Sequence, residues 1–315
     1  MTHAHATDST DSAQLAGQTI VVTGASDGIG RAAVRACAAA GAQVVMIGRN
    51  EAKTAAAARA IMGETGSRTI TWEIADLSLQ ESVRNLAARL KARHPQIHTL
   101  VNNAGALYVE REETSEGLER TFALNHLAYF TLTLLLLDPL LAASRPNDPA
   151  RVINVSSRAH RDALFALDDL QSVHRYRSWR AYADSKFANI LFTRALARRV
   201  DPSMLVVHAL HPGVVATRFA VNNGRRGRLA RRIMDVVSIP PDAGADTVVW
   251  LATDPSAAQS SGDYWAKRTR IDAARRALDI ALADGLWNKS AELAGIDADG
   301  LIRAAGVASP TVLPS

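Results

Sequence analysis

The chain has 315 residues, 48% of them hydrophobic, and a net charge of +5, which is enough apolar material for a sizeable core. Its one cysteine, Cys37, excludes a disulfide framework within the chain and fits a reducing cytoplasm, where we expect the protein to reside. The first residues lack the pattern of a signal peptide, and the longest apolar run, residues 129–137, is too short to cross a bilayer. We therefore expect no stable membrane insertion.

Strand-like and helix-like segments alternate along the chain. The expected strands are apolar runs at residues 19–23, 43–48, 69–73, 99–102, 151–155 and 205–210. The expected helices include residues 29–40, 53–65, 79–93, 118–142 and 182–199. This alternation predicts an α/β fold, a single-domain Rossmann-type doubly wound parallel sheet with helices on both faces. The domain is expected to span residues 16–298, between disordered tails at 1–15 and 299–315.

A glycine-rich turn follows the first strand, where T-G-A-S-D-G-I-G occupies residues 23–30. Glycines there let the backbone bend sharply and come close to a pyrophosphate at the N-terminus of the next helix. The spacing differs from the G-x-G-x-x-G fingerprint, and such a turn can also serve tight packing alone. Placed after the first strand, it favours a dinucleotide site with these cofactor-binding residues: Gly24, Ser26, Asp27, Gly28, Ile29 and Gly30.

The end of the second strand bears on which nicotinamide cofactor is bound. NAD sites commonly place an acidic residue there to hold the ribose 2′-hydroxyl. This strand ends instead on Gly48 and Arg49, and Arg31 follows the glycine turn. Two arginines and no carboxylate favour a 2′-phosphate, hence NADP over NAD. Glu51 is nearby, but we interpret it as a helix-start residue.

Two later strand ends add candidate cofactor contacts. Asp76 and Leu77 follow the third strand, and the Asp76 carboxylate either accepts a hydrogen bond from an adenine amino group or caps the helix that begins near Leu79. The fourth strand ends in N-N-A-G, and its small residues let a ligand approach the carboxyl edge of the sheet. The candidate contacts there are Asn103, Ala104 and Gly105.

The candidate chemistry lies at the fifth strand and the helix after it. Tyr182 and Lys186 are four residues apart, which places a phenol and an ammonium on one helix face. A fixed cation favours the phenolate, so we expect Lys186 to lower the pKa of Tyr182. Ser156 and Ser157 end the fifth strand, and a serine hydroxyl there could hold a substrate carbonyl while Tyr182 delivers the proton.

Taken in order, T-G-A-S-D-G-I-G, N-N-A-G, N-V-S-S and Y-A-D-S-K resemble the motifs of the short-chain dehydrogenase/reductases. The resemblance covers about residues 15–295 and looks closest to the retinol dehydrogenase-like and protochlorophyllide reductase-like branch. It implies that Ser157, rather than Ser156, orients the carbonyl, that Tyr182 is the general acid or base, and that Lys186 also bonds the nicotinamide ribose. Asn125 would help hold a proton-relay water.

The resemblance also implies a loop that contacts the nicotinamide, with Pro212, Gly213, Val215 and Thr217 as its candidate residues. Similar proteins are often dimers or tetramers through the helices that hold residues 118–142 and 182–199. The substrate mouth is expected to lie at about residues 158–181 and 214–240. No His/Cys ligand spacing indicates a metal.

The sequence thus predicts an NADP-dependent oxidoreductase that interconverts a lipophilic alcohol and its carbonyl compound. The alternative is a cofactor-binding regulatory or scaffold protein on the same fold. A basic run could instead bind a membrane surface, but no nucleic-acid motif accompanies it, and a solvated helix face or lid is the simpler interpretation. The run comprises Arg225, Arg226, Arg228, Arg231 and Arg232.

Overall fold

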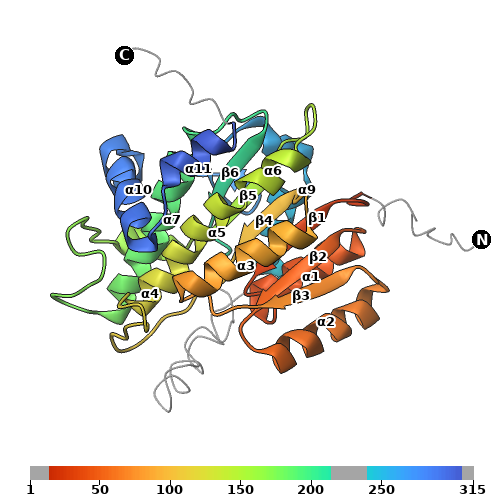
Figure 1. Cartoon of the computed structure of the whole chain (residues 1–315), viewed down its shortest axis with the longest axis horizontal. Helices are drawn as coiled ribbons and strands as arrows, with labels where there is room; N and C mark the ends of the chain where they lie inside the picture. Colours follow the sequence, from red (N-terminus) through yellow and green to blue (C-terminus); the bar gives the residue numbers. More distant parts are fainter. Residues whose placement is uncertain (1–13, 214–239, 307–315) are drawn as a thin grey trace, which may run out of the picture.

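The computed structural model describes residues 14–213 and 240–306, which form one sheet flanked by helices (Figure 1). The strand order is β3-β2-β1-β4-β5-β6-β7-β8. All neighbouring strands pair in parallel except β7 and β8, so the predicted doubly wound parallel sheet is confirmed. The strands are β1 (Thr19–Thr23), β2 (Gln43–Gly48), β3 (Ile70–Ile74), β4 (Thr99–Asn102), β5 (Ala150–Val155), β6 (Leu205–Leu210), β7 (Tyr264–Ala266) and β8 (Thr269–Arg270).

Helices cover both faces of the sheet, as predicted. One core packs α1 (Gly28–Ala39), α2 (Glu51–Thr65) and α9 (Pro241–Thr253) against the sheet. The opposite core packs α3 (Gln80–Arg93), α5 (Ala128–Leu135), α6 (Leu137–Ala143), α7 (Ser178–Ala197), α10 (Ile280–Ala294) and α11 (Ala298–Ala304). The strand order reverses between β1 and β4, so the carboxyl ends of these two strands flank the crevice where such sheets bind ligands.

The regular, straight helix expected at residues 118–142 is wrong, because it contains a π-helical turn and one sharp bend. A short α4 (Arg120–Phe122) runs into a π-helical turn, Ala123–Leu127, before α5 begins. A break then separates α5 from α6, with a bend of 60°. Pro139 explains this break, because proline has no N–H to donate and its ring clashes with the preceding turn of a helix. Short 3-10 turns lie elsewhere at Arg158–Asp162, Pro255–Gln259 and Arg275–Leu278.

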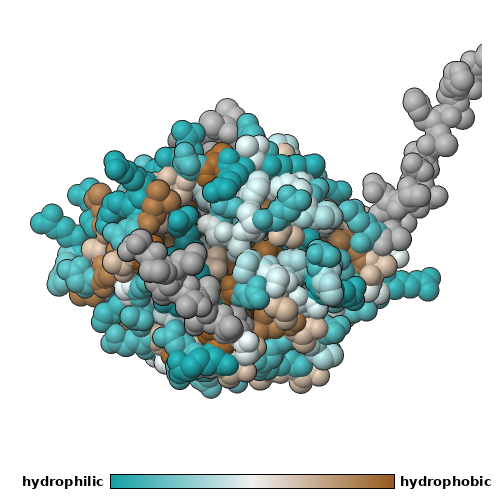
Figure 2. All heavy atoms as spheres, turned by 90° about the horizontal axis from the view of Figure 1, so that it is seen from above, coloured by the Kyte–Doolittle hydropathy of each residue, from teal (hydrophilic) through white to brown (hydrophobic). Residues whose placement is uncertain are grey.

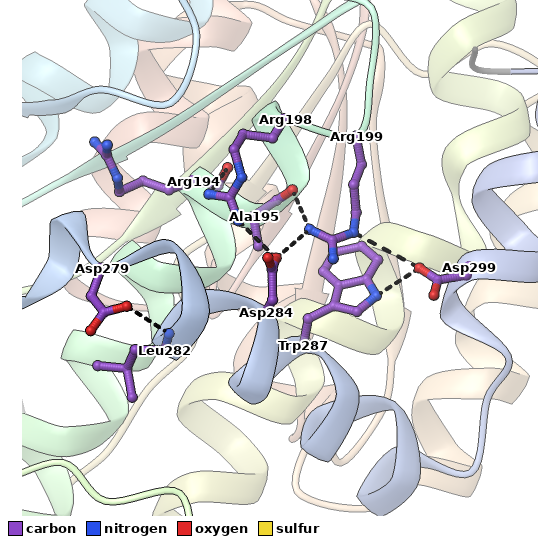
Figure 3. A network of polar contacts seen from close by, with 9 residues as sticks. All are labelled: Arg194, Ala195, Arg198, Arg199, Asp279, Leu282, Asp284, Trp287 and Asp299. Carbon is purple, nitrogen blue, oxygen red and sulfur yellow. Dashed lines mark hydrogen bonds and ion pairs between the residues drawn. The ribbon is translucent and has the colours of Figure 1, made fainter. Parts of the chain in front are cut away.

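The tails predicted at residues 1–15 and 299–315 include residues that the structure places in the folded domain. Leu15 is buried and its N–H donates to Ala40 O at 2.9 Å. At the other end α11 is ordered, with Ile302 buried in the core. A polar network fastens this end (Figure 3): the Arg199 guanidinium lies 4.3 Å from the ring of Trp287, which donates to Asp299 at 3.0 Å. Apolar contacts and these charges are what hold residues 298–304 in place.

The C-terminal helices also cover the faces through which similar proteins were expected to associate. In α5, residues 128–134 are buried, and α7 is buried along most of its length. α10 packs on both of these helices and α11 packs on α5. A dimer through α5 and α7 would therefore require α10 and α11 to move.

The surface and the helix lengths add two observations. Figure 2 shows a face on which hydrophilic residues predominate and apolar residues gather in a few patches. Within residues 14–213 and 240–306, no single helix has the length and apolarity to cross a membrane, although the bent pair Arg120–Leu135 and Leu137–Ala143 meets those criteria jointly.

Candidate active site

The turn from β1 into α1 brings backbone together so closely that only glycine fits. Gly24 has φ +64°, and a Cβ on it would lie 2.8 Å from Ala104 Cα. A Cβ on Gly30 would overlap Gly24 O and lie 2.6 Å from Asn103 Nδ2. The Asn103 amide donates to Thr23 O at 2.8 Å, which ties the end of β4 to this turn. The result is a glycine-lined cradle at a helix N-terminus, and it fits the pyrophosphate of a dinucleotide.

Some of the candidate cofactor-binding residues at the rim of this cradle also make contacts within the protein. Ser26 and Ile29 are half-buried. The Asp27 carboxylate accepts from Gly28 N at 2.8 Å as the cap of α1, and it pairs with Lys53 at 2.8 Å. Asp27 therefore holds the turn and α2 together, a role that its sequence position does not reveal.

The end of β2 has no room for the acidic residue of an NAD site. A Cβ on Gly48 would overlap Thr54 Oγ1, so a carboxylate there would have to displace Thr54. Arg49 is exposed, whereas the Arg31 guanidinium is paired with Glu64 at 2.6 Å. Of the two arginines, Arg49 has no ion pair among the described residues.

Asp76 does not cap the helix that follows it, so that alternative is wrong. Its carboxylate accepts from Ser78 N at 3.0 Å and from Ser78 Oγ at 2.7 Å within a local turn. The N-terminus of α3 is held by Glu116, whose carboxylate accepts from Gln80 N at 2.6 Å. Leu77 is buried in the core.

The structure distinguishes the two serines at the end of β5. Ser156 is buried and its hydroxyl donates to Lys186 O at 2.7 Å, which fastens β5 to α7. Ser157 is half-buried, its hydroxyl oxygen accepts from Ala159 N at 3.2 Å, and it hydrogen-bonds the Tyr182 hydroxyl. Ser157 is thus the serine that faces Tyr182.

Lys186 lies close to the Tyr182 ring and to the Asn125 side chain. Its ammonium donates to Val155 O at 2.9 Å and lies 5.7 Å from the centre of the Tyr182 ring. A Cβ on Gly105 would come to 3.2 Å from both Lys186 Nζ and Asn125 Oδ1. The structure therefore brings Asn125, Ser157, Tyr182 and Lys186 together at the carboxyl edge of the sheet, beside the glycine cradle.

Burial controls the protonation of this pair. It raises the pKa of Tyr182 to about 12, partly opposed by the hydrogen bond from Ser157, and it lowers the pKa of Lys186 to about 7. The shift of Tyr182 is opposite to the lowering that the sequence led us to expect from Lys186. The physical reason is that a dry environment disfavours both charged forms, and a lysine with a pKa of about 7 is only half-charged at neutral pH.

The π-helical turn holds Asn125 toward the lysine. Asn125 Oδ1 accepts from Ala106 N at 2.9 Å, and its amide nitrogen donates to Ala106 O at 2.9 Å. π-turns within helices are rare and often mark functional sites. Behind this turn, Asn189 Nδ2 donates to Asn125 O at 2.9 Å and Asn189 Oδ1 contacts His126 Nδ1 at 3.1 Å. Sequence reasoning missed Asn189, and its place one turn after Lys186 was the available signal.

His160, also missed, supports the Ser157 turn from behind. Its Nε2 accepts from Ala274 N at 3.0 Å, so Nδ1 carries the proton and donates to Ser157 O at 2.7 Å. The imidazole lies edge-on to the Tyr264 ring, which is 5.9 Å from His211. Pro212 and Gly213 follow His211 at the end of β6. Val215, Thr217, the basic run and the mouth segment from 214 to 239 lie outside the described residues.

Apolar side chains pack around Tyr182. Ala159 and Ala183 pack with Tyr182, and Leu107 and Ala163 lie against them. Trp179 completes the surroundings, with its ring 5.9 Å from the Tyr182 ring. Within residues 14–213 and 240–306, no group of three or more His, Cys, Asp or Glu side chains is arranged to hold a metal ion.

Three comparisons place this geometry among known proteins. The sequence pattern of the short chain dehydrogenase family matches residues 18–226. Mouse retinol dehydrogenase 12 is 37% identical over 91% of this chain and 89% of its own, and human polyprenol dehydrogenase is 34% identical over 88% and 84%. A Mycobacterium paratuberculosis protein of uncharacterised function superposes with a TM-score of 0.73 at 31% identity, covering 91% of this chain and 96% of its own. A putative Escherichia coli short chain dehydrogenase complexed with NADPH gives 0.61 at 30% identity, covering 80% and 97%.

Proposed function

This chain belongs to the short-chain dehydrogenase family, and we propose that it is an NADP-dependent oxidoreductase that interconverts a lipophilic alcohol and its carbonyl compound. The observation that carries the proposal is the grouping of Ser157, Tyr182 and Lys186 beside the glycine cradle. The three side chains bring a hydroxyl donor, a proton source and an amine that is half-charged at neutral pH close together. That combination suits proton transfer to or from an oxygen that exchanges a hydride at its carbon.

Each side chain has a distinct task in this proposal. When bound, the nicotinamide supplies or accepts the hydride. Ser157 donates a hydrogen bond to the substrate oxygen and holds the carbonyl in place. Tyr182, whose raised pKa keeps it protonated at neutral pH, gives its proton to the oxygen as the carbonyl is reduced. Lys186 then stabilises the phenolate, and Asn125 keeps the lysine side of the space polar so that a proton can return.

The choice of NADP rests on the rim of the cradle. Gly48 leaves no space for a carboxylate and Arg49 is exposed beside it, which favours a 2′-phosphate over a 2′-hydroxyl. Arg49→Ala is therefore expected to raise the Kd of NADPH about tenfold or more, roughly the loss of one charge-assisted contact, and to leave the Kd of NADH nearly unchanged. Arg59→Ala, an exposed arginine on α2, is the matched control.

A lipophilic substrate is supported by the apolar side of the Tyr182 pocket and by the names of the relatives, retinol and polyprenol dehydrogenases. The test is a screen of alcohols, aldehydes and ketones that follows NADPH and NADH absorbance in parallel. We expect turnover of lipophilic compounds with NADPH. Tight NADPH binding without turnover of any compound would favour the regulatory or scaffold alternative.

A further inference from the structure

Trp179 stands three residues before Tyr182 on α7, which places both aromatic rings on one face of the helix. Their centres are 5.9 Å apart and their planes are tilted by 38°. Tyr182 is only 7% exposed, whereas Trp179 is 52% exposed. The indole is thus the open aromatic surface next to the buried candidate acid.

A hydrogen bond ties the indole to the segment between β5 and α7. Trp179 Nε1 donates to Asp162 Oδ2 at 3.1 Å, and Asp162 ends the 3-10 turn that begins directly after Ser157. Arg180 fastens the next part of the segment by donating to Leu164 O at 3.2 Å. Because its polar atom is already bonded, the indole has only its apolar faces and edges to offer a ligand, and a fixed ring loses little entropy on binding.

These contacts define an apolar wall beside the reacting position. Leu107, Ala159 and Ala163 form the inner part of the wall around Tyr182, and Trp179 forms its outer part. A substrate oxygen bonded to Ser157 and Tyr182 would place the group next to its carbonyl carbon near this wall.

We propose that Trp179 is a specificity-determining residue, a platform on which a flat aromatic or conjugated group next to the substrate carbonyl packs. This inference rests on the proposed function and narrows it from lipophilic compounds in general to those with a flat unsaturated group. Offset and edge-to-face arrangements of two π-systems are favourable beyond the area they bury.

The test compares three aldehydes with wild-type and variant protein in the presence of NADPH. Cinnamaldehyde carries a flat conjugated group, 3-cyclohexylpropanal carries a similar bulk that is not flat, and propanal carries neither. Trp179→Ala is expected to raise the KM for cinnamaldehyde about tenfold, the loss of one aromatic packing partner. The KM for propanal and the Kd of NADPH should stay within about twofold of the wild-type values. Trp179→Phe keeps an aromatic ring, so its KM for cinnamaldehyde should be close to that of wild type.

Met204→Ala is the matched control, because Met204 is also a partly exposed apolar residue but precedes the amino end of β6, away from the site. Equal changes in KM for all three aldehydes in Trp179→Ala would overturn the platform while leaving the proposed function intact. The platform would also be overturned, with the proposed function intact, if Trp179→Ala changed the molecular mass in solution but no KM. Trp179 would then lie in an interface between copies of the protein. Wild-type protein that binds NADPH but turns over neither these three aldehydes nor any compound of the wider screen would overturn both.

Discussion

The buried ammonium of Lys186 is expected to make the stability of the protein depend on pH in a defined window. Lys186 is buried and its ammonium makes one hydrogen bond, to Val155 O. Desolvation lowers its pKa from 10.5 to about 7. Between these two pH values the unfolded chain binds a proton that the folded protein does not, so the free energy of unfolding rises as pH increases.

The size of the effect follows from the same two values. At about 1.36 kcal/mol per pH unit, burying the Lys186 amine lowers the free energy of unfolding by ~4 kcal/mol at pH 7 and by ~2 kcal/mol at pH 9. Lys186→Met removes the titrating group, so its stability relative to wild type should fall by ~2 kcal/mol between pH 7 and pH 9. The lost hydrogen bond to Val155 O adds a constant that does not change with pH.

Urea unfolding followed by tryptophan fluorescence, without added nucleotide, measures this difference. Other titrating groups, including the buried Cys37, are common to both proteins and cancel when the two are compared. Lys289→Met is the control, because Lys289 is half-exposed and pairs with Glu292 at 2.9 Å. A stability difference between Lys186→Met and wild type that is the same at pH 7 and pH 9 would refute the assignment of Lys186 as a desolvated amine.

Three further outcomes are expected from single substitutions. Ser157→Ala should lower kcat/KM about a hundredfold while the Kd of NADPH stays unchanged, since it removes the hydroxyl that holds the carbonyl and that bonds Tyr182. Steady-state absorbance and a separate binding titration would show it. Gly48→Ala should destabilise the protein by ~1–3 kcal/mol, because its methyl group overlaps Thr54, whereas Gly63→Ala, with open space around it, should stabilise α2 by ~0.5–1 kcal/mol in thermal unfolding. Arg199→Ala should cost ~1–2 kcal/mol and increase hydrogen exchange in α10 and α11, and unchanged exchange there would contradict the proposed anchoring.

The sheet could be predicted because its signals are local and strong. Several of the strands that the sequence indicated are continuous Val/Ile/Leu runs, and β1, β5 and β6 are buried at every position. β7 and β8 were missed because strands of three and two residues are too short to show an apolar run or an alternating pattern. The helix at residues 118–142 was predicted as regular and straight, because apolar composition reveals neither the π-helical turn nor the bend near Pro139.

The candidate site was predictable where a motif fixes a backbone shape and less so where tertiary contacts decide. Gly24 and Gly30 are required because other atoms come too close for a side chain, and the glycine-rich motif makes this requirement visible in the sequence. The contacts of Asp27, Asp76 and Arg31 depend on partners that are distant in sequence or on local turns, so sequence position alone did not reveal them. The pKa of Tyr182 was predicted in the wrong direction because spacing reveals a nearby cation but not the dryness of its surroundings.

The most direct test of the account is the turnover of Tyr182→Phe, measured alongside its NADPH affinity. Loss of the hydroxyl should reduce kcat for the best carbonyl substrate by about a hundredfold or more, the usual contribution of a positioned proton donor, while the Kd of NADPH stays within about twofold. Tyr176→Phe, which also removes a tyrosine hydroxyl in the neighbouring segment, should turn over normally. Wild-type turnover by Tyr182→Phe would contradict the claim that Tyr182 transfers the proton.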